Sequence, residues 1–306
     1  MSKLHQALDS YLALRRALGF KLDRAEHLLR LFIDYLHEQQ SSFVTTAMAL
    51  AWVTKSNHAS PITLACRLSS VRRFAQHLHA SDPRHEVPPV GLIPYRRIRY
   101  QPYIYSDEDV AALIQATQGI RHPFKTATYA TLFSLLAVTG MRLGEALALD
   151  HTDLDWDDAV LIVRDSKFQK SRELPLHSTT LDALSRYADK RNVFCSRPRT
   201  QSFFVSISGT RLFNKNVHFS FLKILRNAGL SERRPRPRIH DLRHSFAVNT
   251  IRRWYEDGLD VEPRIASLST YLGHVSPTST YSYLTATPEL MALAAKRRER
   301  AMEKLP

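Results

Sequence analysis

The sequence of 306 residues contains little cysteine. Its two cysteines, Cys66 and Cys195, are far apart, and neither lies in a C-x-x-C pattern or beside several histidines. Cysteines in such settings are typical of zinc sites and redox motifs, so the chain gives no indication of either. We expect both side chains to be reduced thiols.

Long apolar runs are also absent. No segment approaches the roughly 20 apolar residues that a membrane-spanning helix needs. Residues 1–5 lack the apolar core and the cleavage site of a secretory signal. The sequence has no internal repeat and no low-complexity segment. It therefore predicts a cytoplasmic protein without a membrane partner.

Acidic residues are scarce relative to basic ones: 29 Asp and Glu stand against 43 Lys and Arg, a net charge of +14. Residues 1–100 hold 14 basic and 7 acidic side chains, and the remainder hold 29 and 22, so each part carries +7. An excess of this size favours a polyanionic partner. Both parts could touch phosphate, as a clamp would, although a generally basic protein would have the same total charge.

The length favours two domains. Apolar residues recur at helical spacing in four stretches before residue 80, which predicts a small helical bundle. This periodicity then disappears in a proline-rich segment. Ser106, followed by three acidic residues, predicts the start of a new helix. We therefore expect a helical domain at 1–82, a linker at 83–103 and a second domain at 104–306.

The second domain is predicted to be mainly helical with one β insertion. Residues 159–163, Ala-Val-Leu-Ile-Val, favour a strand, and residues 173–176, Glu-Leu-Pro-Leu, resume an extended pattern after a polar stretch. We therefore expect these two segments to form a hairpin or a small sheet. The expected fold class is mainly α with a small β-sheet, that is, an α+β domain behind a helical amino-terminal domain.

Two of the four patterns that could carry chemistry lie in the first half of this domain. Residues 139–145, Thr-Gly-Met-Arg-Leu-Gly-Glu, follow an apolar helix, and the glycine permits a sharp turn that places Arg142 at the next helix start, where an anion is favoured. The polar tip of the hairpin could carry Lys167 into a DNA groove. Taken singly, both patterns are also typical of solvated surface groups.

A third pattern pairs histidine with arginine. His240 and Arg243 are three residues apart, so they share one face of a predicted first helical turn and could bind a phosphate. A capping histidine is the alternative. His244, four residues after His240, would also suit a metal pair, but no third ligand lies nearby in the sequence.

The fourth pattern ends in tyrosine. Gly273 predicts a helix stop, and Ser276-Pro277 predicts the start of the next helix, so His274 would be held in the gap. Tyr283 falls about two turns into that next helix and could point back at the same cavity. An ordinary packed tyrosine is the alternative.

The joint order of these residues distinguishes them from four unrelated surface features. Arg142, Lys167, His240, Arg243, His274 and Tyr283 follow one another at intervals of 25, 73, 3, 31 and 9 residues. In this order and spacing the chain resembles the tyrosine recombinase family of phage integrases, Xer proteins and Cre. The resemblance covers about residues 102–290, and the first domain resembles the core-binding domain of that family in helical character only.

The resemblance implies a site-specific recombinase that cuts and rejoins DNA through a temporary 3′-phosphotyrosyl bond. Arg142 and Arg243 match the two arginines that grip the scissile phosphate, and paired guanidiniums can neutralise the charge that grows on it. His274 matches the histidine or tryptophan that hydrogen-bonds the same phosphate. The phosphotyrosine ester stores the bond energy, so neither ATP nor a metal nor another cofactor is implied.

Three further residues have roles in proton movement and nucleophilic attack by the same resemblance. Lys167 matches the hairpin lysine that protonates the departing 5′ oxygen, and His240 matches the residue that assists proton movement at the nucleophile. Tyr283 matches the nucleophile. Because a phenol has a pKa of about 10, a cationic pocket has to favour the phenolate. Glu145 stands where an acidic residue often supports the first arginine.

Two of these assignments have a competitor nearby. Lys170 lies in the same turn as Lys167, and the spacing to the second β segment favours Lys167. Phe168 replaces a residue that is commonly glycine in the family, which leaves the geometry of the turn open. Tyr281 is the other candidate phenol, and the interval from the preceding histidine favours Tyr283.

The implied partner is double-stranded DNA, bound at paired sites by a homotetramer or a heterotetramer at the nucleoid. An apolar pattern at 288–294 followed by basic residues resembles the tail that docks on a neighbouring subunit, and packing on its own domain is an equal alternative. Further DNA contacts are expected from arginines of the fourth helix and of the segment around His240, namely Arg67, Arg72, Arg73, Arg236 and Arg238.

Two other functions remain possible from the sequence. A type IB topoisomerase shares these residues but acts without pairing two DNA sites. A DNA-binding protein that kept the fold and lost the chemistry would have no need of suitable residues at all six catalytic positions, which are occupied here.

Overall fold

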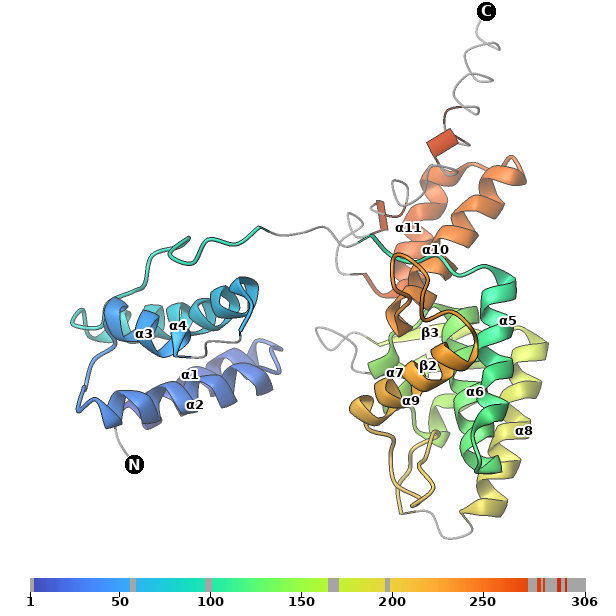
Figure 1. The fold of residues 1–306 in the computed structure, drawn as a ribbon, viewed down its shortest axis with the longest axis horizontal. Helices are drawn as coiled ribbons and strands as arrows, with labels where there is room; N and C mark the ends of the chain where they lie inside the picture. Colours follow the sequence, from blue (N-terminus) through green and yellow to red (C-terminus); the bar gives the residue numbers. More distant parts are fainter. Residues whose placement is uncertain are drawn as a thin grey trace, which may run out of the picture. The chain divides into compact units, whose positions relative to one another are not determined.

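The structure is a computed structural model that describes residues 3–55, 59–96, 101–164, 171–195 and 199–274, together with residues 280, 281, 283, 291, 292 and 295. The predicted helix start at Ser276-Pro277 and most of the predicted tail lie outside the described residues. The chain divides into two compact units, residues 1–99 and residues 100–306, which we call unit 1 and unit 2 (Figure 1).

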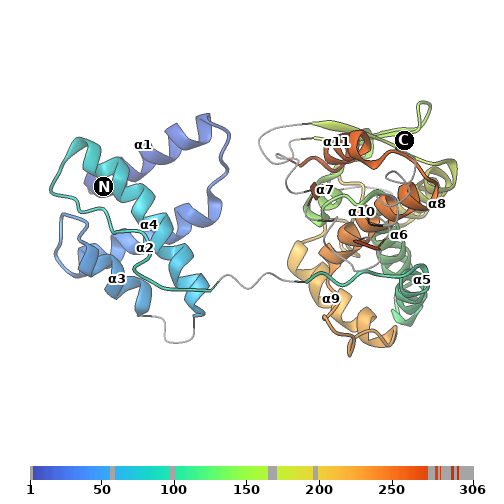
Figure 2. The same ribbon diagram turned by 90° about the horizontal axis from the view of Figure 1, so that it is seen from above.

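In its described residues, unit 1 is a bundle of four helices, as the apolar spacing predicts (Figures 1 and 2). Thr45 and Ser60 each begin a helix by accepting a hydrogen bond from the backbone N–H three residues further on. The apolar faces meet in one core around Phe32 and Phe74, which are fully buried. The helices are α1 (Lys3–Ala17), α2 (Asp23–Glu38), α3 (Thr46–Thr54) and α4 (Pro61–Ser81).

The segment after α4 packs on unit 1. His85 is buried, and its Nδ1 accepts a hydrogen bond of 3.1 Å from the N–H of Val44. Arg72 of α4 donates to the carbonyls of Pro88, at 2.7 Å, and Pro89, at 2.8 Å. The prolines predict a linker from residue 83 onward, but these hydrogen bonds between distant residues attach the first part of that segment to the bundle.

Unit 2 is mainly helical with a small antiparallel sheet, which is the fold class predicted. Its first helix begins with the predicted serine cap: Ser106 accepts from the N–H of Asp109, and the Asp109 carboxylate accepts from the N–H of Ser106. In chain order the elements are α5 (Asp107–Gln115), η1 (Ala116–Gly119), α6 (Pro123–Thr139), α7 (Leu143–Ala148), η2 (His151–Asp153), β1 (Leu154–Asp155), β2 (Val160–Val163), β3 (Arg172–Pro175), α8 (Ser178–Phe194), α9 (Asn214–Asn227), α10 (Ile239–Glu256) and α11 (Val261–Leu272).

The sheet has the order β1-β2-β3 and contains the predicted hairpin. β2 and β3 pair antiparallel, with Leu161 opposite Leu174 and Val163 opposite Arg172. Successive residues of a strand face opposite sides, so Arg172 shares a face with Leu174, which is fully buried. The sequence did not predict β1, because two residues are too few to show a periodicity.

The core of unit 2 forms around α6, which packs against α5, α8 and α10. Leu132, Phe133 and Leu136 of α6 are fully buried in it. A smaller cluster of apolar residues joins α10 to α11 and includes Tyr283. Of the helices that the structure describes, none is long and apolar enough to cross a membrane.

Candidate active site

The turn between α6 and α7 determines where Arg142 lies. α6 ends at Thr139, and Gly140 follows with φ at 60°, in the left-handed region that favours glycine. A Cβ on Gly140 would lie only 2.5 Å from Cδ1 of Phe246, so the packing against α10 also requires glycine. Arg142 then begins α7, and its N–H donates to Oε2 of Glu145 at 2.8 Å. The predicted sharp turn is confirmed.

Arg243 projects from α10 into the interior of unit 2 and is 2 % exposed. Its Nη1 donates to the carbonyl of Gly140 at 2.8 Å, and its Nη2 donates to the carbonyl of Leu272 at 2.7 Å. Burial, and next the charge of Arg142, lowers the pKa of Arg243 to about 10, so the guanidinium remains charged at neutral pH. The two arginines predicted to share a phosphate therefore lie near each other.

His240 stands one turn before Arg243 in α10. Its ring meets that of His244 edge to face, with the centroids 4.8 Å apart. Burial within the cluster, followed by the charges of His244 and Arg243, lowers the pKa of His240, although part of the residue is open to solvent. A neutral imidazole at this place can accept a proton. In the described parts of the chain, no group of three side chains could hold a metal with these histidines.

α11 ends as the sequence predicts. Gly273 follows Leu272 in the left-handed conformation, with φ at 65° and ψ at 45°. The N–H of His274 reaches back to the carbonyl of Ser269 at 3.0 Å, which closes the end of the helix. His274 therefore leaves the helix in a fixed direction.

The imidazole of His274 is held by a residue that the sequence did not predict. Its Nδ1 lies 2.7 Å from Oγ1 of Thr280, which is fully buried. Burial, and then the charges of Arg243 and Arg142, lowers the pKa of His274 to about 4. His274 is therefore neutral at pH 7, and Thr280 fixes the orientation of its ring.

Tyr283 lies among these groups and is 4 % exposed. Its ring centroid is 5.5 Å from that of His244 and 5.9 Å from that of His274. Burial raises the pKa of Tyr283, and the charge and hydrogen bonding of Arg243 act in the opposite direction. Tyr281, the competing phenol, is 49 % exposed. Tyr283, and not the exposed Tyr281, therefore lies beside His274 and Arg243.

Glu145 lies beside Arg142 and is nearly buried, with 8 % of its side chain exposed. Its Oε1 accepts from Nη1 of Arg142 at 2.7 Å, and its Oε2 accepts from Nη2 of Arg172 at 2.8 Å. Arg172 was not among the residues predicted for the site. The signal was present in the alternation of β3, which places Arg172 on the face of Leu174, where a charged residue needs a partner.

The predicted lysines cannot be placed in the same way. Lys167 and Lys170 both lie in the segment 165–170, which is outside the described residues. The strands on either side are described, and the pair Val163–Arg172 closes the hairpin at its base.

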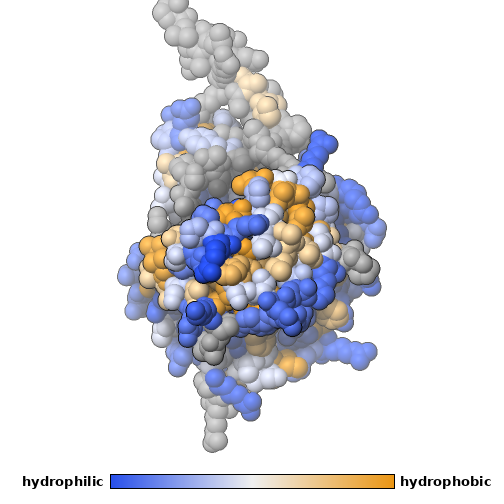
Figure 3. Space-filling model, turned by 90° about the vertical axis from the view of Figure 1, so that its left-hand side faces the viewer, coloured by the Kyte–Doolittle hydropathy of each residue, from blue (hydrophilic) through white to orange (hydrophobic). Residues whose placement is uncertain are grey.

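The arginines predicted to touch DNA have different surroundings. Arg73 is exposed on α4, whereas Arg67 is half-buried there and Arg72 is engaged with proline carbonyls of its own unit. On the face of unit 1 that Figure 3 shows, hydrophilic side chains are interspersed with apolar ones. In unit 2, Arg236 and Arg238 are exposed, and Arg238 donates to the carboxylate of Asp241 at 3.2 Å.

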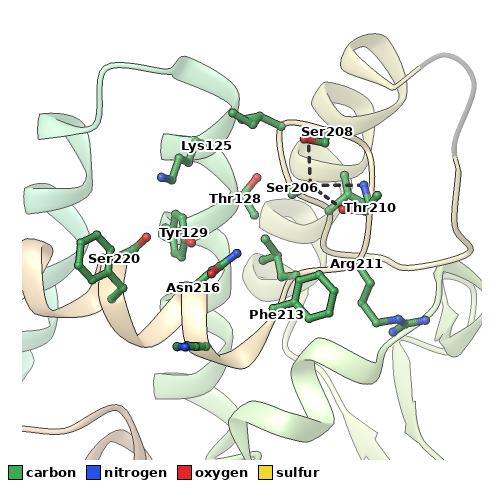
Figure 4. Close-up of a pocket in the computed structure, with 15 residues that line it drawn as sticks. Lys125, Thr128, Tyr129, Ser206, Ser208, Thr210, Arg211, Phe213, Asn216 and Ser220 are labelled. Carbon is green, nitrogen blue, oxygen red and sulfur yellow. Dashed lines mark hydrogen bonds between the residues drawn. The ribbon is translucent and has the colours of Figure 1, made fainter.

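A hollow of about 630 Å³ lies elsewhere in unit 2, between α6, α9 and the loop that precedes α9 (Figure 4). Its lining mixes cations such as Lys125 and Arg211 with aromatic rings such as Phe213. None of the predicted site residues that the structure describes lines this hollow. The hollow is therefore separate from the candidate active site.

Comparisons with known proteins agree with this geometry. The sequence model of the phage integrase family matches residues 104–289. The chain is 42 % identical over 311 residues to a putative integrase/recombinase, y4rB, of Sinorhizobium fredii, with 99 % of both chains covered. It is 26 % identical to the tyrosine recombinase XerC of Chromobacterium violaceum, over 82 % of this chain and 79 % of that one.

Solved structures share the fold at low sequence identity. The Tn1549 transposon integrase in complex with transposon right end DNA superposes with a TM-score of 0.67 at 16 % identity, covering 98 % of this chain and 99 % of that one. A lambda integrase dimer bound to a core site gives a TM-score of 0.60 at 18 % identity, covering 92 % and 94 %. With the family match over most of unit 2 and the relative aligned along its whole length, the chain belongs to the phage integrase family of tyrosine recombinases.

Proposed function

We propose that the chain is a site-specific DNA recombinase that cuts and rejoins DNA strands through a 3′-phosphotyrosyl bond at Tyr283. The observation that carries this proposal is the convergence of Arg142, Arg243, His274 and Tyr283, which come from the start of α7, from α10, and from beyond the end of α11. The relatives named integrase/recombinase and XerC support recombination as the reaction.

In the cleavage step the hydroxyl oxygen of Tyr283 attacks the phosphorus, and the bond from phosphorus to the 5′ oxygen breaks. The phenolic proton passes to His240, whose imidazole is neutral, and Lys167 or Lys170 gives a proton to the departing 5′ oxygen. One phosphate ester replaces another, so the bond energy is kept for rejoining. The second step is the reverse, with the 5′ hydroxyl of another strand as the nucleophile.

The guanidiniums provide the electrostatic part of this reaction. Burial raises the pKa of Tyr283, which disfavours the phenolate, and the charges of Arg243 and Arg142 oppose that effect. The same two charges can neutralise the additional negative charge of the five-coordinate phosphate. His274 is neutral and can donate a single hydrogen bond without adding to the positive charge of the site.

We infer from the family that the substrate is double-stranded DNA and that the working assembly is a tetramer on two paired sites. One structural neighbour is a lambda integrase tetramer bound to a Holliday junction, and the net charge of +14 is suited to a polyanion. Arg67, Arg73, Arg236 and Arg238 remain proposed DNA contacts. The reaction would take place in the cytoplasm, at the nucleoid.

A nicked suicide substrate tests the proposal. A duplex selected from random sequence for binding to the protein is nicked next to the cleavage position, so that the released fragment is lost and the covalent complex accumulates. The wild type is expected to form a complex that resists denaturant and disappears after protease treatment. Tyr283→Phe, which lacks the hydroxyl, is expected to form none.

Tyr281→Phe is the matched control, because it removes an exposed hydroxyl two residues away. It should retain the covalent complex. If Tyr283→Phe still forms the complex, or if the wild type forms none on DNA that it binds, the proposal is wrong. Relaxation of supercoiled DNA without joint molecules would indicate topoisomerase activity instead.

A further inference from the structure

Three consecutive carbonyls at the end of α11 accept hydrogen bonds from three different arginines. Nε of Arg172 donates to Tyr271 at 2.8 Å, Nη2 of Arg243 to Leu272 at 2.7 Å, and Nη2 of Arg142 to Gly273 at 3.1 Å. The last carbonyls of a helix have no partner within the helix and carry its partial negative charge. This helix end therefore holds three guanidinium groups in place. Two of them, Arg142 and Arg243, act in the proposed reaction, and the third is Arg172.

Arg172 differs from Arg142 in exposure and from Arg243 in its partners. Its side chain is 10 % exposed, compared with 29 % for Arg142, and it pairs with a carboxylate, whereas Arg243 donates to the carbonyls of Gly140 and Leu272. Nη1 and Nη2 donate to the two carboxylate oxygens of Glu145 at 3.2 and 2.8 Å, while Nε is engaged with the end of α11. All three nitrogens of Arg172 therefore donate to protein groups, and the Glu145 carboxylate faces its charge, so Arg172 is poorly suited to binding DNA phosphate and acts by holding other parts in place.

The surrounding residues are adapted to Arg172. A Cβ on Gly273 would lie 2.7 Å from Nη1 and 3.0 Å from Cζ of Arg172, so the glycine that ends α11 also leaves room for the guanidinium. Burial alone would raise the pKa of Glu145, but the hydrogen bonds and charge of Arg172, together with Arg142, lower it below its ordinary value. Glu145 is therefore a carboxylate shared between the two arginines.

The position of Arg172 along the chain connects this network to the hairpin. Arg172 is the first residue of β3 and pairs with Val163 at the base of the hairpin, whose connecting segment 165–170 includes Lys167 and Lys170 in the sequence. If Arg172 were shortened, Arg142 would keep its own bonds to Glu145 and Gly273. β3 would lose its bonds to α7 and to the end of α11 at this residue.

We propose that Arg172 is a positioning residue that fixes the base of the lysine-bearing hairpin to the ends of α7 and α11, and so places the general acid at the departing 5′ oxygen. This proposal rests on the proposed function. Arg172 acts through the hairpin lysine and does not itself touch the DNA. Its loss should therefore impair proton donation far more than it impairs phosphate binding.

A substrate with sulfur in place of the departing 5′ oxygen separates these two effects. A thiol has a pKa of about 8.5, so a thiolate leaves without protonation and needs no general acid. Arg172→Lys keeps the positive charge but loses the planar guanidinium that bonds Glu145 and Tyr271 together. For this variant we expect covalent-complex formation on the oxygen substrate to fall about 100-fold, the size of a general-acid contribution. On the sulfur substrate the rate should fall by less than about 5-fold, because only the placement of the acid is lost.

The ratio of the two rates is the decisive measurement, because both are measured on one preparation and a smaller folded fraction lowers them equally. Arg164→Lys is the matched control: Arg164 flanks the other side of the same turn and pairs with Asp153. It should match the wild type on both substrates. Equal losses for Arg172→Lys on the oxygen and sulfur substrates, or no loss on either, would refute the positioning role.

Failure of this proposal and failure of the proposed function give different results. If the wild type forms no covalent complex on either substrate, or if Tyr283→Phe forms one, the function itself is wrong. If the wild type reacts with both substrates and Tyr283→Phe with neither, the function stands, and the ratio for Arg172→Lys alone decides the role of Arg172.

Discussion

The arginines of the two units carry the same charge in different surroundings. In unit 1, Arg16 and Arg30 lie on the surface of the bundle and form ion pairs with Glu26 there. In unit 2, Arg172 and Arg243 are buried and donate to backbone carbonyls or to a buried carboxylate. Exposed ion pairs contribute at most about 1 kcal/mol, whereas an enclosed guanidinium leaves unsatisfied partners if it is removed. The equal net charges of the two parts of the chain conceal this difference.

Arg243→Lys should have the largest effect. An ammonium on a shorter stem cannot bond both Gly140 and Leu272 while presenting a fork to phosphate. We expect single-turnover cleavage to fall by about 100- to 1000-fold. The free energy of unfolding, measured in urea, should fall by about 1–3 kcal/mol, because a buried carbonyl loses its partner.

Arg30→Lys is the matched substitution in unit 1. Because Arg30 is 40 % exposed, its replacement should change the free energy of unfolding by less than about 1 kcal/mol and leave cleavage unchanged. If Arg243→Lys and Arg30→Lys cleaved DNA at the same rate, the difference in burial between these two arginines would have no effect on the reaction.

The second comparison uses two left-handed glycines. Gly140 in unit 2 is packed so closely that a Cβ would clash with Phe246, whereas a Cβ on Gly19 in unit 1, with φ at 84°, would meet nothing within 4 Å. Gly140→Ala should therefore lower the free energy of unfolding by about 2–5 kcal/mol, from backbone strain and overpacking together. Gly19→Ala should cost only about 1 kcal/mol, the backbone part. Denaturation of each full-length variant measures both values, and equal losses would contradict the packing at Gly140.

The smallest expected effect concerns acid. Burial as the main cause lowers the pKa of His240, His244 and His274 in unit 2 to about 4, and it also lowers the pKa of His85 in unit 1. Between the ordinary pKa of 6.5 and a pKa of about 4, the unfolded chain binds protons that the folded unit does not. Stability is therefore complete above pH 6.5 and declines as the pH falls through that window.

Since unit 2 holds three of these four histidines, it should lose stability faster than unit 1. Amide hydrogen exchange, measured for each unit at pH 7 and at pH 5 and corrected for intrinsic rates, should show the greater loss of protection in unit 2. His244→Phe should reduce that loss. A greater loss in unit 1 would show that His85 dominates the acid response.

The parts of the fold that depend on neighbouring residues could be predicted from the sequence. The glycine turn before Arg142, the serine cap at Ser106 and the glycine stop at Gly273 each depend on a few adjacent residues, and all three predictions are confirmed. The order and spacing of the site residues resemble those of a known family. They therefore predicted that residues far apart in the sequence form one site, which no local pattern could do.

Features that depend on distant partners escaped prediction. Arg172 meets Glu145 and Tyr271, which are 27 and 99 residues away, and no local pattern specifies such contacts. The hydrogen bond from Arg72 to Pro88 likewise has no local signal in the sequence, so the proline-rich stretch was predicted to be a linker from its first residue. Thr280 was hidden in a run of small polar residues that reads as a helix start. The choice between Lys167 and Lys170 remains a prediction, because both lie outside the described residues.

The row of carbonyls at the end of α11 also constrains how this protein can change during evolution. Each residue of an α-helix turns the chain by about 100°, so inserting or deleting one residue before Tyr271 would rotate the last carbonyls away from all three guanidiniums together. The solvent-facing side chains of α11 are free to vary, but the number of residues between its core contacts and Gly273 is not. Changes in length should therefore accumulate in the loop before Val261, which lies outside the helix.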